Sequence, residues 1–258
     1  MMRRFKADLH VHTCLSPCAD LEMTPSAIIS AAVERGIDII AITDHNSAEN
    51  VIAAKKAAED TSVTVLAGME ITSVEEAHVL ALMEDVEGIM KIQDVVYENL
   101  TPGENIPPLP PFDKGKPGGF FQVVVNEKDE VLDFNKRLLI GATSLSVQEI
   151  LNTIHLLGGL AVASHIDREA FGIISQLGFI PRDMKLDALE LSPNTGMEKA
   201  RRLFGEYGSF TWITSSDAHC LRDLGRRTTG FFMKQPTLEE MILAFKNIDG
   251  RKTEWGRE

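Results

Sequence analysis

The sequence predicts an α/β protein with a mostly parallel sheet that is closed, or nearly closed, into a barrel. Short apolar or β-branched runs alternate with segments of helical periodicity along most of the chain. About seven such units follow one another, which favours a barrel over an open doubly wound sheet. No GxGxxG or GxxxxGKS/T motif follows any strand pattern, so the sequence lacks the common phosphate-cradling nucleotide loops.

The first part of the chain alternates between strand and helix patterns. Residues 4–12 have a period of two, which predicts a strand. Thr24 as N-cap, Pro25 at the first helical position and Gly36 as a stop predict a helix over residues 25–35. Further strands are expected at 37–43, 63–69 and 78–83, and a helix at 48–60.

The alternation resumes after residue 142. Helices are expected at 146–158, 168–178, 196–208 and 237–247, and strands at 159–164, 187–192, 210–216 and 228–233. Because parallel strands share the edge where they end, residues that follow these strands should lie on one rim of the barrel.

Residues 100–142 interrupt this rhythm. The stretch 101–119 is rich in proline and glycine, and 120–141 resemble a hairpin that turns at residues 126–129. The segment is too short to bury much core by itself, so we interpret it as an insertion into one domain spanning residues 1–258. It is either a lid over the site or an elaborate connection.

Composition indicates a cytoplasmic protein. The formal net charge of -12 provides no basic surface for a long polynucleotide, although a local metal cleft can still hold phosphates. Three irregularly spaced cysteines do not form a disulfide framework. The N-terminus lacks an apolar signal stretch, and no run approaches the ~20 apolar residues that cross a bilayer, so no membrane partner is expected. The oligomeric state is left open.

Potential metal ligands gather at the predicted strand ends. Six of the seven histidines lie there, namely His10, His12, His45, His78, His165 and His219. Glu70 and Asp217 share this location, whereas His155 lies inside a helix pattern. Such a cluster of titratable groups is costly to bury unpaired, and a bound metal removes that cost.

The spacing of individual residues adds geometry. His10 and His12 are two apart on a strand, so they point to the same side and can hold one ion. Asp44 is a candidate to orient an imidazole rather than to bind metal itself. Cys14 and Cys220 are expected to be packing residues.

The motifs "DLHVHT", "ITDHN", "GMEIT", "HVLAL", "ASH" and "SSDAH", in that order between Asp8 and about Thr229, resemble the PHP family, the polymerase and histidinol phosphatase superfamily. The resemblance implies a distorted seven-stranded (β/α) barrel with up to three metal ions. It also implies that the chain is a metal-dependent phosphoesterase.

The resemblance also implies a ligand set. A first metal would be held by His10, His12, Glu70 and Asp217, which would form the catalytic core. Glu70 would bridge to a second metal held also by His78 and His165. A third would use His45 and His219, with Cys18 at the position where many relatives have a histidine, or with Asp20 nearby.

Mixed imidazole and carboxylate ligands suit zinc, manganese or iron better than magnesium or calcium. Two or three such ions could activate a water and hold phosphoryl oxygens. Arg168, Arg222 and Arg226 follow ligand-bearing strand ends and are candidate substrate contacts. Glu190 and Asn194 are further candidates to line the pocket.

We therefore expect a hydrolase that acts on a small phosphomonoester or nucleotide, such as histidinol phosphate, a nucleoside bisphosphate or a short RNA end. Nucleic acid is expected only as a short substrate. The alternative is a noncatalytic, metal-stabilised PHP scaffold or regulatory module. Amidohydrolase-type C–N hydrolysis is less favoured, because no lysine follows a mid-chain strand where such barrels need one.

Overall fold

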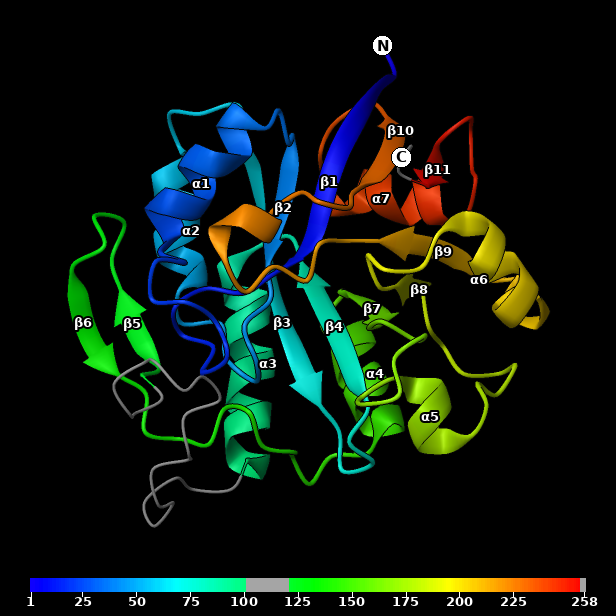
Figure 1. Ribbon diagram of the computed structural model, residues 1–258, viewed down its shortest axis with the longest axis horizontal. Helices are drawn as coiled ribbons and strands as arrows, with labels where there is room; N and C mark the ends of the chain where they lie inside the picture. Colours follow the sequence, from blue (N-terminus) through cyan, green and yellow to red (C-terminus); the bar gives the residue numbers. More distant parts are fainter. Residues whose placement is uncertain (101–120, 256–258) are drawn as a thin grey trace.

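A nine-stranded sheet forms the centre of the molecule (Figure 1). The computed structural model describes residues 1–100 and 121–255. Its strands are β1 (Arg3–Val11), β2 (Ile39–Ile42), β3 (Thr64–Thr72), β4 (His78–Met83), β7 (Leu160–Ala163), β8 (Ala188–Leu191), β9 (Thr211–Thr214), β10 (Thr229–Met233) and β11 (Lys252–Trp255). They are ordered β11-β10-β1-β2-β3-β4-β7-β8-β9.

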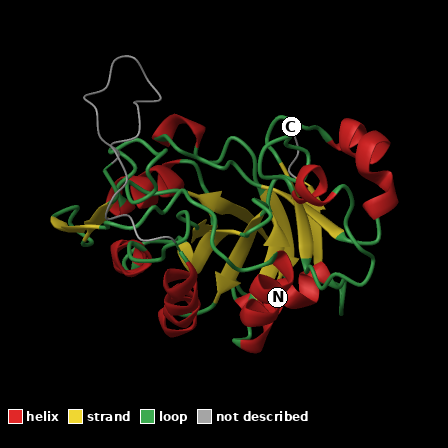
Figure 2. Cartoon of the chain, turned by 90° about the horizontal axis from the view of Figure 1, so that it is seen from below, coloured by secondary structure: helices red, strands yellow, loops and turns green. Residues whose placement is uncertain are grey.

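Helices surround the sheet, and many of the loops gather along one side of it (Figure 2). The helices are α1 (Pro25–Glu34), α2 (Val51–Ala58), α3 (Val86–Asn99), α4 (Val147–Leu156), α5 (Ile173–Leu177), α6 (Met197–Phe204) and α7 (Leu238–Phe245), with short 3₁₀ turns η1 (Gly205–Tyr207) and η2 (Leu221–Asp223). Within the described residues, none of these helices is both long and apolar enough to span a membrane.

Most strands run the same way. The pairings β1–β2, β2–β3, β7–β8 and β8–β9 are parallel, whereas β4 and β10 are antiparallel to their neighbours. The carboxyl ends of the other strands therefore share one rim with the amino end of β4. His78, the first residue of β4, reaches that rim because its strand is reversed.

The sheet is nearly closed. Beyond β9, His12 N–H donates to the Ala218 carbonyl at 3.1 Å, and Ala218 N–H donates to the His10 carbonyl at 3.3 Å. Between β9 and β10, the Thr229 hydroxyl accepts from Thr214 N–H and donates to the Thr214 carbonyl, both at 2.8 Å. The predicted α/β class and barrel shape are confirmed, but the nine strands do not establish a count of seven β/α units.

Two apolar layers follow from the alternation of side chains along the strands. The inner layer fills the barrel and includes Phe5, Leu66, Leu80, Val162 and Ile213, joined by residues of α7. The outer layer packs the remaining helices onto the sheet. Both layers are buried, so the barrel is a filled core rather than a pore.

A bulge in β1 changes which residues face inward. Ala7 pairs with Ile39 and Asp8 with Ile40, but Val11 pairs with Ile42, so β1 has one extra residue. Leu9 belongs to the inner layer, whereas Val11 belongs to the outer one. The bulge therefore turns the side chains of His10 and His12 toward the inside of the rim.

Several boundaries differ from the sequence-based prediction. Helix α1 has the predicted Thr24 cap, whose side chain accepts from Ala27 N–H. Helix α3 was not predicted, although Asp85 caps it by accepting from Gly88 N–H at 2.8 Å. Strand β11 was also missed. The helix expected at 168–178 is shortened to α5, because the residues before it form a loop in which Phe171 has a positive φ of 62°.

The predicted hairpin is present as β5 (Val123–Val125) and β6 (Val131–Phe134), which pair outside the large sheet at the left edge of Figure 1. Asn50 fastens it by donating to the Val123 carbonyl at 3.0 Å and accepting from Val125 N–H at 2.9 Å. The proline- and glycine-rich residues 101–119 lie outside the described residues, so the choice between a lid and a connection stays a prediction.

Candidate metal centre

The rim of the barrel gathers side chains from most of its strands. On β3, Leu66 points inward, and strand alternation places Glu70 on the same side. Eight predicted ligands meet here: His10, His12, His45, Glu70, His78, His165, Asp217 and His219. All are buried except His219, whose side chain is about one third exposed (31%).

Glu70 lies at the centre of this cluster. The nitrogens closest to Oε1 are His78 Nδ1 at 2.9 Å, His165 Nε2 at 3.2 Å and His10 Nε2 at 3.3 Å. Those closest to Oε2 are His45 Nδ1 at 3.2 Å and His12 Nε2 at 3.5 Å. One carboxylate therefore contacts five imidazoles, with a different set at each oxygen.

Asp217 provides the second carboxylate of the cluster. Its Oδ1 lies 3.3 Å from His10 Nε2, 3.2 Å from His12 Nε2 and 3.6 Å from His219 Nδ1. Its Oδ2 is paired with Arg168 Nη2 at 2.5 Å. Asp217 (φ 50°) and His165 (φ 27°) both have left-handed backbones. Such conformations are uncommon for residues other than glycine, although Asp and His adopt them more often than most, and they often occur at functional sites.

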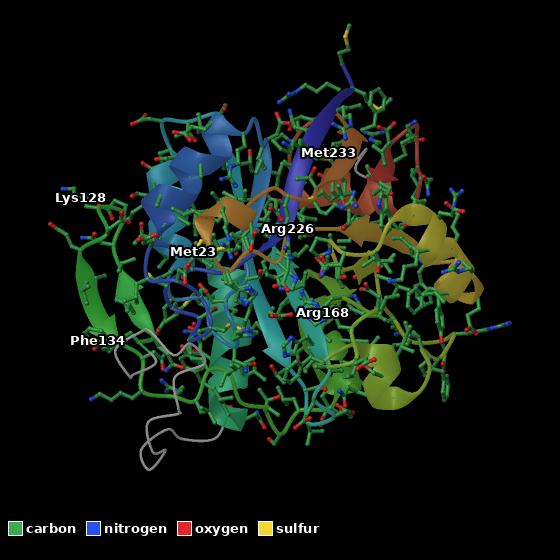
Figure 3. All side chains as sticks on the ribbon, viewed as in Figure 1. Met23, Lys128, Phe134, Arg168, Arg226 and Met233 are labelled. Carbon is green, nitrogen blue, oxygen red and sulfur yellow. The ribbon has the colours of Figure 1, made fainter. Side chains whose placement is uncertain are left out.

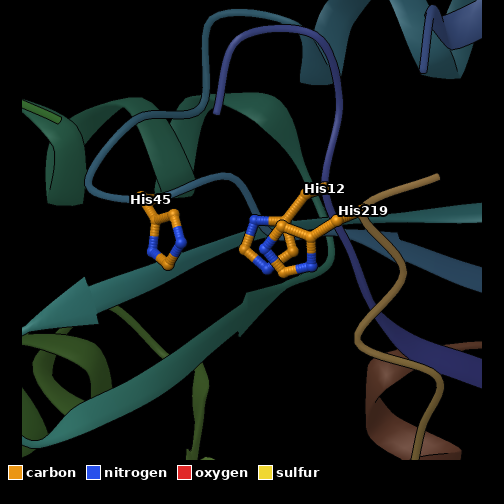
Figure 4. Close-up of side chains that lie close together, drawn as sticks. All are labelled: His12, His45 and His219. Carbon is orange, nitrogen blue, oxygen red and sulfur yellow. The ribbon is translucent and has the colours of Figure 1, made fainter. Parts of the chain in front are cut away.

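Three groups of side chains offer ligand atoms within 4.8 Å of one another: His10, His12 and Glu70; His45, Glu70 and His78; and His12, His45 and His219. The first two groups share Glu70. Figure 4 shows the third, in which the His12 and His219 rings stack with centroids 4.2 Å apart. The three groups overlap, and the third contains no carboxylate.

Unpartnered nitrogens show that these residues fit metal ions. Within the described part of the chain, His10 Nε2, His12 Nε2, His45 Nδ1 and His165 Nδ1 are buried and form no hydrogen bond. A buried polar atom without a partner costs about 1–3 kcal/mol. Coordination in the cluster would satisfy the nitrogens of His10, His12 and His45, which lie next to Glu70, whereas His165 would offer its Nε2 rather than its unpartnered Nδ1. The mixture of nitrogen and carboxylate donors is one that zinc, manganese and iron accept.

Burial and neighbouring charges shift the pKa values of the cluster in different directions. Burial, followed by the nearby His219 imidazole, lowers the pKa of His12 to about 3. Burial alone would raise the pKa of Glu70, but the imidazoles of His78 and His10 outweigh it and lower that pKa well below its usual value. Neutral imidazole and ionised carboxylate are the forms that bind metal, and the shifts favour these forms at His12 and Glu70. His10 differs: burial lowers its pKa, but the carboxylates of Glu190, Glu70 and Asp217 outweigh burial and raise that pKa well above its usual value, so this ring must lose a proton when it binds metal.

The outer partners of the cluster include two acids. Glu190 Oε2 accepts from His10 Nδ1 at 2.8 Å and from His165 N–H at 3.2 Å. Asp44 accepts from the Ser16 hydroxyl at 2.6 Å, and that hydroxyl contacts His12 Nδ1 at 3.0 Å. Asp44 therefore orients an imidazole through Ser16 rather than by direct contact. Ser16, four residues after His12, was not singled out from the sequence.

Asp8 fixes the loop that carries Asp217. Its two carboxylate oxygens accept from Ser216 N–H at 2.9 Å and from Gly225 N–H at 2.8 Å. Burial raises the pKa of Asp8 to about 6, although these hydrogen bonds oppose that shift. The first residue of the "DLHVHT" motif thus joins the start of the chain to its last ligands.

The two candidates for completing the third set lie on a turn beside His219. Asp20 N–H donates to the His219 carbonyl at 2.8 Å. Cys18 is exposed and belongs to none of the three groups. Desolvation by the protein around it is the main cause that raises the pKa of the Cys18 thiol, and the negative charges of Glu70 and Asp217 raise it further. Cys18 is therefore close enough to the cluster to interact with its carboxylates. Its role as a ligand stays a prediction.

The three predicted arginines have different environments. Arg168 contacts the cluster directly through Asp217. Arg226 Nε donates to the Ser216 carbonyl at 3.2 Å, next to Asp217 in sequence. Figure 3 shows both over the middle of the sheet. Arg222 has a largely exposed side chain and contacts only its neighbour Asp223, at 3.9 Å, among the described residues.

The other residues singled out from the sequence lie partly at the cluster and partly away from it. Glu190 is buried at the site, whereas Asn194 is exposed. His155 lies outside the cluster and pairs with Asp187 at 2.8 Å. Cys14 packs against Val123 and Val125, as expected for a packing residue. Cys220 Sγ lies 3.2 Å from an Asp223 carboxylate oxygen.

Comparison with known proteins gives a family and a fold. The sequence model of the PHP domain matches residues 8–170. The uncharacterized protein MJ1587 of Methanocaldococcus jannaschii is 37% identical over 90 residues, which are 31% of this chain and 53% of that protein. The phosphoribosyl 1,2-cyclic phosphate 1,2-diphosphodiesterase of Eggerthella lenta is 30% identical over 80 residues, 29% of each chain.

Among solved structures, the lesion-specific endonuclease PfuEndoQ of Pyrococcus furiosus superposes with a TM-score of 0.72 at 20% identity. The match covers 97% of this chain and 58% of the endonuclease. This chain thus matches little more than half the length of MJ1587 and of the endonuclease, and less of the diphosphodiesterase. At this identity, the structural similarity supports the fold alone.

Proposed function

The chain belongs to the PHP domain family, and we propose that it is a metal-dependent phosphoesterase that hydrolyses a small phosphomonoester or nucleotide. The observation that carries this proposal is the position of Glu70, whose carboxylate lies within 3.5 Å of five imidazole nitrogens. Divalent ions at such a site lower the pKa of a bound water and stabilise charge on phosphoryl oxygens.

We propose three sets of ligands. The first is His10, His12, Glu70 and Asp217; the second is Glu70, His78 and His165; and the third is His45 and His219 with Cys18 or Asp20. The contact of His12 with both His45 and His219 supports a third set, because these rings already lie together. Glu70, shared by the first two sets, would fix the spacing between two ions.

The chain's own residues prepare the site for a phosphate. Burial and the cluster of imidazoles exclude bulk water from the carboxylates. The Arg168 guanidinium, 36% exposed at its side chain, points at Asp217 and can offer its other donors to phosphoryl oxygens. Arg226 can do the same from the opposite loop, and Arg222 is positioned to act only at longer range.

The comparisons support a class of reaction, the cleavage of phosphoesters, but not a particular substrate. By their names, the diphosphodiesterase acts on a cyclic phosphodiester and the endonuclease on lesions in nucleic acid, so both cleave phosphoesters. A net charge of -12 makes a long polynucleotide a poor partner for this chain's surface as a whole. We therefore favour a small substrate or a short nucleic-acid end.

The test is an assay of the purified protein reconstituted with manganese, zinc or iron(II). The panel contains phosphomonoesters, nucleoside bisphosphates, cyclic phosphodiesters and short oligonucleotides. We expect turnover of at least one class, lost in Glu70→Gln, which keeps the side-chain shape and removes the charge. Metal binding without turnover of any class would instead support a noncatalytic scaffold.

A further inference from the structure

Phe171 is a partly exposed aromatic residue at the edge of the metal cluster. Its ring stacks on the His78 imidazole with centroids 4.5 Å apart and planes 14° apart. Its carbonyl accepts from His78 N–H at 3.0 Å. Even so, 37% of Phe171 is exposed. One face of the Phe171 ring therefore packs on His78, a proposed metal ligand, and part of the rest of the ring is exposed to solvent.

The backbone of Phe171 is in a disfavoured conformation. Its φ of 62° lies in the left-handed region, which bulky residues rarely adopt. Such conformations persist where the surrounding structure imposes them, often at functional sites. Helix α5 could have started earlier, as the sequence predicts, but the loop places an aromatic ring on His78 instead.

The loop holding Phe171 is firmly anchored. Asp167 accepts from Ser192 N–H at 2.7 Å, from the Ser192 hydroxyl at 2.6 Å and from the Thr195 hydroxyl at 2.7 Å. At Gly172, a Cβ would lie 2.5 Å from the Arg168 carbonyl oxygen, so the loop is also tightly folded. Phe171 therefore has a fixed position relative to Arg168, three residues earlier.

This geometry suggests what lies beside the scissile phosphate. A phosphoryl group held by Arg168 and the metal cluster would place its ester substituent next to the exposed part of the Phe171 ring. A planar base can continue the stack that His78 and Phe171 begin, and it offers a larger flat contact area than a ribose or an aliphatic chain.

We propose that Phe171 is a stacking platform for a nucleobase, so that the substrate is a nucleobase-bearing phosphoester. This inference rests on the proposed function and narrows its substrate class. The base belongs either to a mononucleotide or to the end of a short oligonucleotide, and stacking serves both.

The test compares two substrates that differ only by the base. Adenosine 5′-monophosphate and ribose 5-phosphate carry the same kind of phosphomonoester, and the measured quantity is the ratio of their kcat/KM values. In Phe171→Leu this ratio should fall about 5- to 150-fold, the equivalent of roughly 1–3 kcal/mol of stacking per base. Leucine at the same φ keeps apolar cover over His78, and the ratio cancels any general effect on the metal cluster.

Two further variants complete the design. Phe171→Trp should retain the preference, because it keeps a flat ring. Phe179→Leu is the matched control, since Phe179 is 61% exposed but is not part of the cluster, and its ratio should match that of the wild type. A 5′-phosphorylated dinucleotide tests the source of the base: a higher kcat/KM for it than for the mononucleotide would assign the base to an oligonucleotide end.

A binding measurement separates this inference from the proposed function. Calorimetric titration of the metal-loaded protein with non-hydrolysable phosphonate analogues of both compounds involves no turnover. We expect tighter binding of the adenosine monophosphate analogue than of the ribose phosphate analogue, and loss of that difference in Phe171→Leu. Equal losses for both compounds would overturn the inference and leave Phe171 as a cover for His78. Absence of turnover with a retained binding preference would overturn the proposed function alone.

Discussion

Glu190 on β8 accepts a 2.8 Å hydrogen bond from Nδ1 of His10 on β1, although 180 residues separate them in sequence. The bond fixes the His10 ring with Nε2 directed at Glu70 and Asp217. Acids that hold a ligand ring in this way raise its basicity and fix its tautomer.

We predict that Glu190→Gln weakens metal binding about 10- to 100-fold while the protein remains folded. The amide keeps the shape of the side chain but lacks the charge and can present its NH₂ to the ring. Titration calorimetry with zinc or manganese measures the effect, and Glu198→Gln on an exposed position of α6 is the control. Equal affinities in Glu190→Gln and the wild type would contradict a positioning role for Glu190.

His10→Ala should remove bound metal and reduce phosphoesterase activity by more than about 100-fold, because a direct ligand should matter more than its outer partner. The measurement is metal content by mass spectrometry together with the assay. His155→Ala is the matched control, since His155 pairs with Asp187 away from the cluster. Full metal content in His10→Ala would argue against the first proposed set.

Removal of metal should lower thermal stability. Metal present at about 100 times its dissociation constant stabilises the folded state by about 2.7 kcal/mol. For a protein of this size that corresponds to roughly 5–10 °C in Tm. Scanning calorimetry with manganese, with chelator and after re-addition of metal gives the comparison. An unchanged Tm in all three conditions would show that the cluster does not bind manganese in the folded state.

Because of the ion pair between Glu240 and Arg251, we expect the free energy of unfolding to depend on pH in the acid range. Arg251 Nη2 lies 2.8 Å from Glu240 Oε1, and Lys234 N–H donates to Oε2 at 2.8 Å. These contacts lower the pKa of Glu240 from 4.5 to about 2, and the hydrogen bond from Arg251 has the largest effect. Because the folded pKa lies below the unfolded one, the stabilisation is complete above about pH 4.5 and is lost as the pH falls toward 2.

Glu240→Gln should therefore be less stable than the wild type at neutral pH, with a difference that shrinks between pH 4.5 and 2. Urea unfolding at several pH values measures both curves. If the two curves stay parallel down to pH 2, the Glu240 carboxylate does not titrate as this geometry requires.

Many strands and helices were predicted from local sequence patterns alone. Short apolar or β-branched runs marked most strands, period two marked the first, and Thr24 with Pro25 marked the start of α1, because such runs and caps depend on near neighbours in the chain. Helix α3 was overlooked even though Asp85 caps it and Ile89, Ile92 and Val96 have helical spacing. Its signal was available in the sequence.

The sequence by itself determined that histidines and acids follow successive strands, and hence that a metal cluster was expected. Only the tertiary structure decided how they meet. The bulge in β1 turns His10 and His12 inward, and the reversal of β4 brings His78 to the same rim. Glu190 became visible as the partner of His10 only when β1 and β8, which are distant in the chain, were placed together. Strand direction, register and bulges depend on pairing between segments far apart in the chain, so local periodicity does not determine them.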